Sequence, residues 1–451
     1  MTVVSREVMV RSGMGRSVTA TVAPLGGRSV VLFRVGPSEH AGALTLADGE
    51  KIAAAARMAL DERCPLVGVI DSSGADIHEG LAALHGWGVA ARAMQRCSGM
   101  VPVVLVVEGA AVSGPALLLG LADIVIATQA AFAYVSGPDR VSAMTGWTVT
   151  RQELGGADQL ARLSGVAWLV ARDRDEALDL VAETLSFLPD HGDEPPPFFP
   201  TTDPVDRLVE DLRHLIPATA TGGYDVRRVL EGIADDGEVL ELRSRWAPQL
   251  VTAFARIGGR AIGVVANQPQ AMAGTLDIAA SQKGAAFVEL CDAFNLPIVT
   301  VVDTPGFMPG KDLEWRGMIR HGAQLVFAYG AATVPRVCLL LRKAYGGAYI
   351  VMDSKALGND VCLAWPSAEV AVMGARGAVQ ILHRGESAER QAELEEAYGE
   401  QFLNPYVAAE RGYVDAVVDP AETRLVIHQA LSMLDSKRED LKGRKHDNGP
   451  L

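Results

Sequence analysis

Two turns of small residues, one in each half of the chain, have the composition of backbone anion-binding sites. The apolar run Val103–Val107 leads towards Ser113-Gly114, and the apolar run Val337–Leu341 leads towards Gly346-Gly347. A strand that passes through such a turn into a helix directs unpaired backbone N–H groups and the positive end of the helix dipole at one point. In an enzyme that point can be an oxyanion hole, which stabilises a negative oxygen without any side chain. The alternative is a tight turn whose glycines only let a helix pack closely on a strand.

The spacing of these turns from two earlier aspartates indicates an internal duplication. One apolar run ends at Asp71 and a similar run ends at Asp303. Gly114 follows Asp71 by 43 residues (114 − 71 = 43), and Gly347 follows Asp303 by 44 residues (347 − 303 = 44). Agreement over so long a stretch predicts two copies of one domain with equivalent turns. If the two copies face each other, they offer two anion sites and a cleft between them.

Alternating strands and helices must position the turns. Two apolar runs, Ser17–Val22 and Ser29–Val35, predict a hairpin with Gly26-Gly27 at its turn. Apolar residues at helical spacing predict a helix over Thr45–Arg63. A helix is also compatible with Ile350–Lys355, after the C-terminal turn. Together these patterns predict an α/β fold with parallel strands joined by right-handed crossovers.

The chain is long enough for two domains, and its prolines predict where they divide. It has 451 residues, which exceeds the usual size of a single hydrophobic core. Six prolines lie between Leu188 and Pro204, where neither a helix nor a central strand can accommodate them. We therefore expect a first domain over residues 1–190, a proline-rich linker over 191–204 and a second domain over 205–451. A helix over Ala421–Arg438 is expected near the end.

Composition excludes several classes of partner. The formal net charge of −14 argues against nucleic acid or an anionic membrane as the main partner. The longest apolar stretch, Ala116–Val135, contains Asp123 and Gln129, so we expect buried strand and helix there and no membrane span. The N-terminus does not have the pattern of a signal peptide.

The cysteines favour a reducing compartment. All five occur singly and in apolar surroundings, which is typical of core thiols and not of a structural zinc site. We therefore expect a cytoplasmic protein without disulfides. No Gly-x-Gly-x-x-Gly motif lies between a strand and a helix in a βαβ unit, so a nicotinamide or flavin cofactor is not expected, nor is a metal.

The C-terminal half carries several motifs in a characteristic order. They are Ala266–Pro269, Asp303–Gly310, Arg342–Tyr349, Ala364–Glu369, Val372–Ala375 and Asn404–Asp415. In this order they resemble the carboxyltransferase (β) subunits of biotin-dependent acyl-CoA carboxylases, of the propionyl-CoA and acetyl-CoA carboxylase type. The resemblance implies two tandem crotonase-superfamily domains (ββα spirals) in one subunit, which agrees with the internal duplication.

The resemblance implies a mechanism and its partners. A biotin carrier protein, in the α subunit that also contains biotin carboxylase, would bring carboxybiotin into a cleft. Carbon dioxide would be released there, the biotin ureido nitrogen would take a proton from the acyl α-carbon, and the resulting enolate would attack the carbon dioxide. The acceptor would be an acyl-CoA or a thioester on a carrier protein. No protein acid or base is needed, which agrees with the absence of an obvious His/Asp or paired-carboxylate site.

The resemblance also assigns site residues and an assembly. Gly347 and Ala348 would donate N–H groups to the ureido oxygen of biotin, and Ser113 and Gly114 would donate to the thioester oxygen. Each cleft would combine the N-terminal half of one subunit with the C-terminal half of another, so we expect at least a dimer and, as in the family, a hexamer. The other residues expected to contact substrate are Tyr345, Gly346, Ile350, Ser73, Gly74, Ala75 and Gly137. At position 350 the family places an acyl-facing and often acidic side chain, so isoleucine predicts an acyl group longer than acetyl.

The first half departs from the family pattern. It is shorter at its start, Asp76 stands where the family usually has an arginine, and Ser113 replaces the first glycine of the turn. Pro115 removes a further donor, and Leu160 and Trp168 replace two histidines. These differences, confined to the expected acyl side, predict an unusual acceptor. The same residues also fit a transcarboxylase or a decarboxylase of a malonyl-type thioester, or a non-catalytic paralogue that only assembles with active subunits.

Overall fold

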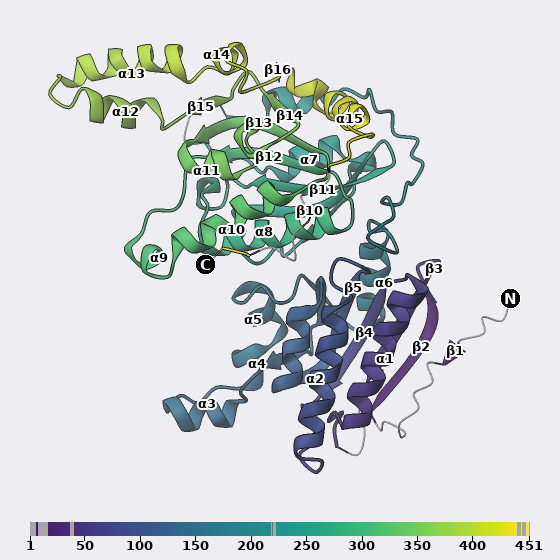
Figure 1. The fold of residues 1–451 in the computed structure, drawn as a ribbon. Coiled ribbons are helices and arrows are strands. Elements are labelled where there is room, and N and C mark those ends of the chain that lie inside the picture. The colour runs from purple at the N-terminus through teal and green to yellow at the C-terminus, as the bar shows by residue number, and fades with distance from the viewer. Residues whose placement is uncertain are drawn as a thin grey trace. The chain divides into compact units, whose positions relative to one another are not determined.

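The computed structural model describes residues 6–7, 17–36, 40–217, 219, 222–439, 443 and 448–450. The chain forms two compact units, which Figure 1 shows in purple to blue and in teal to yellow. Unit 1 contains Met1–Pro197 together with the short segments Arg243–Trp246 and Ala293–Asn295. Unit 2 contains the rest of the chain from Phe198 onwards. The division between Pro197 and Phe198 falls within the expected linker, residues 191–204.

Unit 1 is built on one mixed sheet with the strand order β1-β2-β3-β4-β5-β6-β8, in which β7 pairs with β5. Strands β1, β2 and β3 are antiparallel, and every later pairing is parallel. Figure 1 shows α1 and α2 side by side over this sheet. The elements are β1 (Arg6–Glu7), β2 (Val18–Leu25), β3 (Arg28–Val35), α1 (Leu46–Glu62), β4 (Leu66–Ser72), α2 (Leu81–Gln95), β5 (Val103–Val112), the 3-10 helix η1 (Gly114–Leu121), β6 (Ile124–Thr128), β7 (Phe132–Tyr134), α3 (Pro138–Thr145), α4 (Arg151–Gly155), α5 (Ala157–Arg162), β8 (Leu169–Ala171) and α6 (Arg174–Leu185).

Unit 2 repeats this plan with the strand order β9-β10-β11-β12-β13-β14-β16, in which β15 pairs with β13. Helices η2 (Glu210–His214), α7 (Arg227–Ile233) and η3 (Asp235–Gly237) precede the sheet. The strands are β9 (Val239–Leu242), β10 (Leu250–Ile257), β11 (Arg260–Asn267), β12 (Ile298–Thr304), β13 (Arg336–Tyr345), β14 (Val361–Ala364), β15 (Glu369–Ala371) and β16 (Ala416–Val417). The helices between and after them are η4 (Met272–Gly274), α8 (Ile278–Ala293), α9 (Lys311–Trp315), α10 (Met318–Ala331), α11 (Gly346–Val351), η5 (Lys355–Leu357), α12 (Ala375–Leu382), α13 (Ala388–Phe402), α14 (Pro405–Glu410), η6 (Pro420–Glu422) and α15 (Thr423–Met433).

The identical strand orders confirm the internal duplication. In each unit a Gly-Gly turn connects the two strands of the long hairpin, Gly26-Gly27 in unit 1 and Gly258-Gly259 in unit 2. All four glycines have positive φ, between 58° and 80°, as the two-residue turns that match strand twist require. Each sheet also has an irregular register at the same place, between Ile70 and Ser72 and between Val302 and Thr304. The expected hairpin in the N-terminal half is therefore confirmed, and a second copy lies in unit 2.

Apolar residues on both faces of the parallel strands form the core of each unit, as expected when helices cover both sides of a sheet. In unit 2, α7 and α15 pack on the face that includes Val299, Val301 and Leu339. Trp365 lies in the same core, where its Nε1 donates to Thr423 Oγ1 at 2.9 Å. The opposite face is packed by α8, whose Phe287 and Cys291 lie against Gly263. In unit 1 the central strand β4 and the first half of β5 are almost completely buried.

One expected helix forms as predicted, and two others differ in extent from the observed ones. The helix expected over Thr45–Arg63 forms with Thr45 as N-cap and Arg63 as C-cap. In contrast, no helix covers Ile350–Lys355, because Asp353 adopts a left-handed φ of 58° and its buried carboxylate pairs with Arg336. The helix there is α11, which begins at Gly346 and ends at Val351. The last helix is shorter than expected, since η6 occupies its start and α15 ends at Met433.

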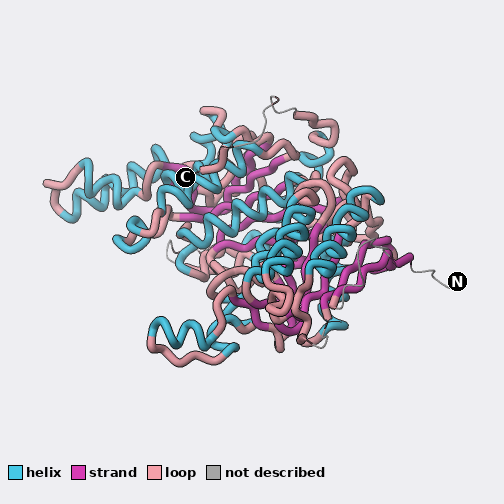
Figure 2. The backbone as a smooth tube through the Cα atoms, turned by 60° about the horizontal axis from the view of Figure 1, so that its bottom comes forward, coloured by secondary structure: helices cyan, strands magenta, loops and turns pink. Residues whose placement is uncertain are grey.

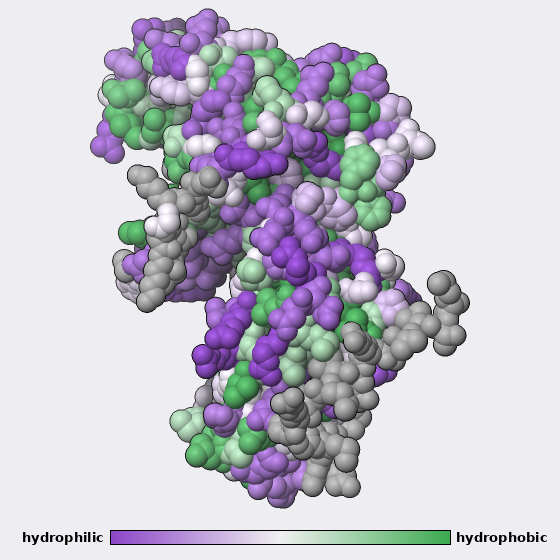
Figure 3. Space-filling view, turned by 45° about the vertical axis from the view of Figure 1, so that its right-hand side comes forward, coloured by the Kyte–Doolittle hydropathy of each residue, from purple (hydrophilic) through white to green (hydrophobic). Residues whose placement is uncertain are grey.

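Apolar side chains on the surface are scattered among polar ones. Figure 3 shows hydrophilic residues surrounding scattered hydrophobic groups on the face that it draws. In Figure 2, α12 and α13 extend from unit 2 as a helical hairpin, and α3 extends from unit 1. The apolar stretch Ala116–Val135 forms η1, β6 and β7. Within the described parts of the chain, none of the helices combines the length and apolar character needed to cross a bilayer.

Candidate functional site

The turn in unit 2 presents backbone donors at the start of a helix. Strand β13 ends at Tyr345, and α11 begins at the next residue, Gly346, whose φ is 57°. A helix cannot satisfy the N–H groups of its own first turn. Among the described residues, no turn, loop or side-chain hydrogen bond uses the N–H of Gly347 or Ala348. Gly347 is exposed and Ala348 is buried, so the two donors lie at the boundary between core and solvent.

A cavity of about 540 Å³ adjoins this turn within unit 2. Its lining is largely apolar, and its cationic side chains are Lys355 and Arg411. Ile350 lies in the lining and is 40% exposed. The cavity walls come from the turn with α11, from the strand β15, and from α13 and α14; the lining residues from α13 and α14 include Tyr398, Phe402, Val407 and Ala408. The structure therefore places four expected residues, Tyr345, Gly346, Gly347 and Ile350, at or beside one apolar hollow.

A buried network fixes the end of β12 against β13 and thereby holds the turn. Asp303 Oδ1 accepts the N–H of Lys343 at 3.1 Å, and its Oδ2 accepts from Tyr224 Oη at 2.8 Å and from Arg342 Nε at 3.1 Å. Burial raises the pKa of the Asp303 carboxyl, and the charge of Arg342 offsets part of that effect. Because the Asp303 carboxylate accepts hydrogen bonds from Tyr224, Arg342 and the backbone of Lys343, it holds the two strands in position.

The turn in unit 1 has the same backbone path but fewer donors. Ser113 occupies the position of Gly346, since each follows the residue at the end of its ladder and each has a positive φ, 65° at Ser113 and 57° at Gly346. The N–H of Ser113 donates to the carbonyl oxygen of Tyr134 at 3.0 Å. Ser113 is therefore not available as a backbone donor, which corrects its expected role. Gly114 corresponds to Gly347, and Pro115, which has no N–H, corresponds to Ala348.

Gly114 is thus the remaining donor of the pair expected in unit 1. No turn, loop or side-chain hydrogen bond of the described residues uses its N–H. A side chain at Gly114 would meet the ring of Trp87 at about 3.0 Å, which explains the need for glycine there. As in unit 2, an aspartate supports the strand before the turn: Asp71 Oδ1 accepts the N–H of Ala110 at 2.9 Å.

The loop Ser73-Gly74-Ala75 lies directly against this turn. A Cβ on Gly74 would come within 3.2 Å of Ser113 Cβ and 3.1 Å of the Val112 carbonyl oxygen, so glycine is required for the approach. The N–H of Ser73 is bonded to Ala41 O at 3.0 Å, and the N–H of Gly74 is bonded to Ser72 Oγ at 3.2 Å. These N–H groups hold the loop in shape, so Ser73 and Gly74 can contact a ligand only through other atoms.

Gly137 stands at the start of α3, where it is the N-cap residue. The ring of Tyr134 lies 3.4 Å from the position that a Cβ on Gly137 would take. Because Tyr134 also accepts the Ser113 N–H, the structure brings Gly137 to the same side of unit 1 as the turn. The expected unit 1 residues therefore form one neighbourhood, and the expected unit 2 residues form another.

Asp76, which replaces the arginine of the family pattern, does not point at the turn. Its carboxylate is buried, with Oδ1 accepting the N–H of His78 at 2.8 Å and Oδ2 lying 2.6 Å from His40 Nδ1. The hydrogen bond with His40, followed by that with His78, lowers the pKa of Asp76. The negative charge of Asp76, which stands where the family pattern has a positive one, is therefore stabilised by His40 and by the backbone N–H of His78.

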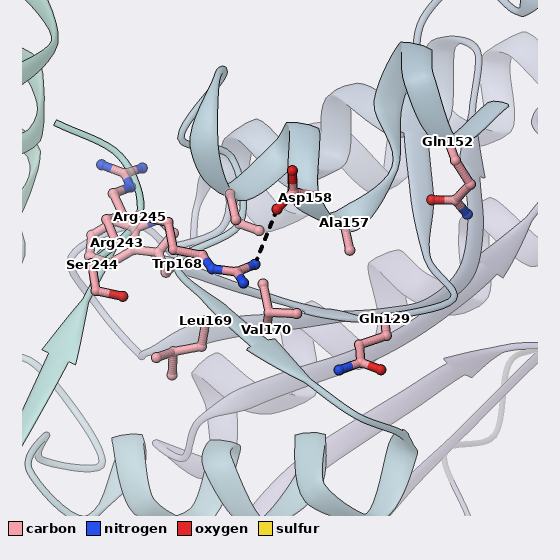
Figure 4. A pocket seen from close by; sticks show the side chains of 12 residues that line it. Gln129, Gln152, Ala157, Asp158, Trp168, Leu169, Val170, Arg243, Ser244 and Arg245 are labelled. Carbon is pink, nitrogen blue, oxygen red and sulfur yellow. Dashed lines mark hydrogen bonds and ion pairs between the residues drawn. The ribbon is translucent and has the colours of Figure 1, made fainter. Parts of the chain in front are cut away.

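A second cavity, of about 480 Å³, lies in unit 1 and contains one of the substituted positions (Figure 4). Trp168 lines it, and the guanidinium of Arg243 stacks over the Trp168 ring at 3.9 Å. Burial lowers the pKa of Arg243 to about 10. The dashed line in Figure 4 is the ion pair between Arg245 and Asp158, 3.4 Å long. Leu160, the other substituted position, is buried in α5.

Some residues of the unit 2 cavity were not expected from the sequence. Helix α13 is mostly exposed, yet its C-terminal turn brings Tyr398 and Phe402 to the cavity. Their ring centroids are 4.9 Å apart. The aromatic pair at i and i+4 was the available signal, since an otherwise charged helix rarely needs two aromatic residues on one face.

The carboxyl transferase domain family matches residues 4–449 of this chain. The chain belongs to this family. The propionyl-CoA carboxylase beta chain of Saccharopolyspora erythraea is 43% identical over 97% of this chain and 84% of its own length. The biotin-dependent acetyl-/propionyl-coenzyme A carboxylase beta5 subunit of Mycobacterium tuberculosis is 42% identical over 97% of this chain and 83% of its own length.

A solved structure supports the same membership. The transcarboxylase 12S subunit, crystallised as a hexamer with methylmalonyl-coenzyme A and methylmalonic acid bound, superposes with a TM-score of 0.94 and 41% identity. The alignment covers 96% of this chain and 85% of that one. The fold of two tandem crotonase-superfamily domains is therefore confirmed. The carboxyl transferase family extends over both halves, including the first half, whose motifs differ most from the family pattern.

Proposed function

We propose that this carboxyl transferase moves carbon dioxide from carboxybiotin on a carrier protein to the α-carbon of an acyl thioester. The observation that carries the proposal is the turn of unit 2, where Gly347 lines a largely apolar cavity of about 540 Å³, and the N–H groups of Gly347 and of the adjoining, buried Ala348 lie in the first turn of α11. The relatives named above, one a propionyl-CoA carboxylase beta chain and the other a biotin-dependent acetyl-/propionyl-coenzyme A carboxylase subunit, support the same reaction class.

The cavity of unit 2 fits a small bicyclic ring with one carbonyl oxygen. Its apolar lining accommodates the hydrocarbon part of biotin, and the two N–H groups can donate to the ureido oxygen. When bound, carboxybiotin supplies the carbon dioxide and a nitrogen that accepts the proton of the acyl α-carbon. Gly347 and Ala348 stabilise negative charge on the ureido oxygen, and one such donor contributes about 3–4 kcal/mol to catalysis. Apolar walls exclude water and strengthen both hydrogen bonds.

The turn of unit 1 is assigned to the acyl thioester. Gly114 donates its N–H to the thioester oxygen, on which negative charge develops when the α-carbon loses its proton. Ser73, Gly74, Ala75 and Gly137 shape the surroundings of that donor. The donor that Ala348 provides in unit 2 has no counterpart here, since Pro115 stands at that position. We expect this side to stabilise its enolate with one backbone donor fewer.

The acyl group is proposed to be longer than acetyl. Ile350 stands where the family pattern places an acyl-facing side chain, and its 40% exposure lets it offer an apolar contact to the acyl group of a thioester held by the unit 1 turn of another subunit. Each further methylene buried against such a side chain contributes about 0.8 kcal/mol. The relatives act, by their names, on propionyl-CoA or on acetyl- and propionyl-coenzyme A. The acyl group is carried as a thioester of coenzyme A or of a carrier protein.

The reverse reaction, in which a carboxyl group is removed from a malonyl-type thioester, is favoured by the structural likeness to transcarboxylase 12S. In a transcarboxylase or decarboxylase, a malonyl-type thioester loses its carboxyl group, and the same two turns stabilise the same enolate. A third possibility, an assembly paralogue without activity, is favoured by the bonded N–H of Ser113 and by Pro115. The free donors of Gly347 and Ala348 argue against it.

We also propose a homo-oligomer, at least a dimer and, as reported for transcarboxylase 12S, a hexamer. Large apolar side chains are exposed on projecting segments, with Met144 and Trp147 in unit 1 at 86% and 74% and Ile319 in unit 2 at 85%. Such exposure is typical of surfaces that a further subunit covers. The further partner is an α subunit with biotin carboxylase and a biotin carrier. Five buried, unpaired cysteines support a cytoplasmic location.

The reaction can be tested with the full chain, a biotinylated carrier, biotin carboxylase, ATP and labelled bicarbonate. We expect label in the carboxylated product of propionyl-CoA or a longer acyl-CoA. Release of carbon dioxide from methylmalonyl-CoA without ATP would instead support the reverse direction. If neither labelled product nor carbon dioxide is formed while the chain still assembles with an active carboxyltransferase subunit, the hypothesis of an assembly paralogue without activity is correct.

A further inference from the structure

Three side chains in unit 1 that the proposed reaction does not use meet at one point. His40, Asp76 and His78 each offer a ligand atom, and these three atoms lie within 4.8 Å of one another. The imidazole rings of the two histidines have centroids 4.7 Å apart. In the sequence, His40 lies 36 residues before Asp76, so the group is brought together only by folding.

The ligand set has a definite chemical preference. Two imidazole nitrogens and one carboxylate oxygen bind divalent transition metals, and they favour zinc and its neighbours over calcium or magnesium, which prefer oxygen. Three protein ligands leave a coordination position open to water or another small ligand. Structural zinc sites made of paired cysteines, which the scattered thiols of this chain exclude, are a separate class.

Hydrogen bonds to backbone carbonyl oxygens join the two loops that carry the ligands. The Ser73 N–H donates to Ala41 O at 3.0 Å, and Ser73 Oγ donates to His40 O at 3.1 Å. The Asp76 N–H donates to Leu44 O at 2.9 Å. Two of the three ligands are therefore held in place before any ion binds, which reduces the entropic cost of forming the site.

Asp76 and His78 have different roles in this cluster. Asp76 is buried, its Oδ1 accepts the His78 N–H at 2.8 Å, and its Oδ2 is hydrogen-bonded to His40 Nδ1 at 2.6 Å, a bond that the entering ion replaces. A hydrogen bond from backbone to the second carboxylate oxygen is the kind of outer contact that fixes a metal ligand. His78 is exposed, so its ring can turn to complete the coordination as an ion enters from solvent.

We propose that His40, Asp76 and His78 bind one divalent transition-metal ion, with Zn²⁺ as the preferred ion. The bound ion ties the loop that begins at His40 to the loop Ser73–His78. Gly74 of the second loop packs against Ser113, so the ion stiffens the surroundings of the Gly114 donor. This inference does not depend on the direction or the substrate of the proposed reaction.

The test uses the untagged full chain, because a histidine tag would itself bind the ion. The protein is stripped with a chelator, dialysed, and titrated with Zn²⁺ in a calorimeter. A parallel titration with Co²⁺ reports the ligands through its visible absorption. We expect one ion per chain, with a dissociation constant in the micromolar range or tighter. Thermal unfolding should shift to higher temperature with Zn²⁺, since an ion that binds only the folded state stabilises it by mass action.

Variants separate this site from adventitious binding. His78→Gln changes an exposed residue and should leave the metal-free unfolding temperature unchanged while abolishing the Co²⁺ spectrum. Asp76→Asn should also abolish it. His214→Gln, which alters an exposed histidine of unit 2, should leave binding intact. The absence of stoichiometric Zn²⁺ binding would overturn the proposal, as would Zn²⁺ binding that His78→Gln and Asp76→Asn leave unchanged.

Discussion

The N–H of Ser113 donates to the carbonyl oxygen of Tyr134 at 3.0 Å. Because of this bond, the turn of unit 1 differs from the turn of unit 2 in the backbone donors that it offers. The bond extends the β5–β7 ladder by one residue, although both turns start from the ends of equivalent ladders. The first position of each turn has a positive φ. The second and third positions are Gly114 and Pro115 in one unit and Gly347 and Ala348 in the other. Unit 1 therefore offers one donor where unit 2 offers two.

Removing a donor from the turn of unit 2 should impair catalysis. Ala348→Pro deletes an N–H in the first turn of α11, a position where proline is tolerated because no intrahelical bond is lost. We expect carboxylation to slow by about a hundredfold, the usual effect of losing one oxyanion donor. Initial rates with saturating carrier and acyl-CoA measure it. Ala348→Gly keeps the N–H and should retain most activity; equal rates for the two variants would rule out this role of Ala348.

Restoring the missing donor in unit 1 should have the opposite effect. Pro115→Ala gives the turn the same pair of N–H groups that unit 2 has. If the acyl side limits the rate, kcat should rise by up to about a hundredfold. The measurement is the rate of acyl-CoA carboxylation, with the carrier-dependent half-reaction as control. A variant that folds normally but shows no change in either rate would indicate that a single donor at Gly114 suffices.

The backbone at Ser113 should carry strain that glycine relieves. Its φ of 65° and ψ of −150° fall in a region adopted almost only by glycine, and such residues cost about 1–3 kcal/mol. Ser113→Gly should therefore stabilise unit 1 by about 1 kcal/mol, after allowing for the greater freedom of glycine in the unfolded chain. Urea unfolding measures it. The reciprocal change, Gly346→Ser, should destabilise, and a Cβ there would lie 3.1 Å from Val372 O.

The side chain at position 350 should influence the choice of acyl group. Ile350→Asp replaces an apolar contact in the cavity with a charge, so carboxylation of propionyl-CoA and longer substrates should fall by about tenfold relative to acetyl-CoA. Competition between acyl-CoA substrates gives the ratio of kcat/KM values directly. Ile350→Val, which keeps an apolar side chain, serves as the control. An unchanged ratio in the aspartate variant would place the acyl group elsewhere.

Stability of unit 2 should decrease in acid through Asp203. Its carboxylate receives two hydrogen bonds from Arg207, at 2.7 Å and 2.9 Å, and the bond to Arg207 is the main reason why the pKa of Asp203 is lowered to about 2. A lowered pKa stabilises the folded state above the ordinary pKa of 3.8, and that contribution disappears as pH falls from about 4 to about 2. Asp203→Asn should flatten this part of the pH profile and lower the unfolding free energy at neutral pH by about 1 kcal/mol. Urea unfolding from pH 7 to pH 2 tests it.

The sequence predicted much of the fold because the relevant signals are local. Alternating apolar runs, the Gly26-Gly27 turn and the capped helix after Thr45 follow from short-range patterns, and the repeated spacing after Asp71 and Asp303 revealed the duplication. The limits of α11 were missed because they depend on a distant contact. Asp353 leaves the helical conformation where its buried carboxylate meets Arg336 Nη1 at 2.8 Å, and no local preference predicts that pairing.

By itself, the sequence determined the family, the two turns and the residues at their tips, because glycine and proline dictate backbone geometry wherever they occur. Only the tertiary structure decided which backbone donors are free. The Ser113 N–H is used by a strand that lies 21 residues further on (134 − 113 = 21), and side chains from α13 reach the unit 2 cavity. Likewise, His40 meets Asp76 and His78 only after β3 and β4 are paired. Hydrogen-bond satisfaction is a property of the folded neighbourhood, so residue type alone does not reveal it.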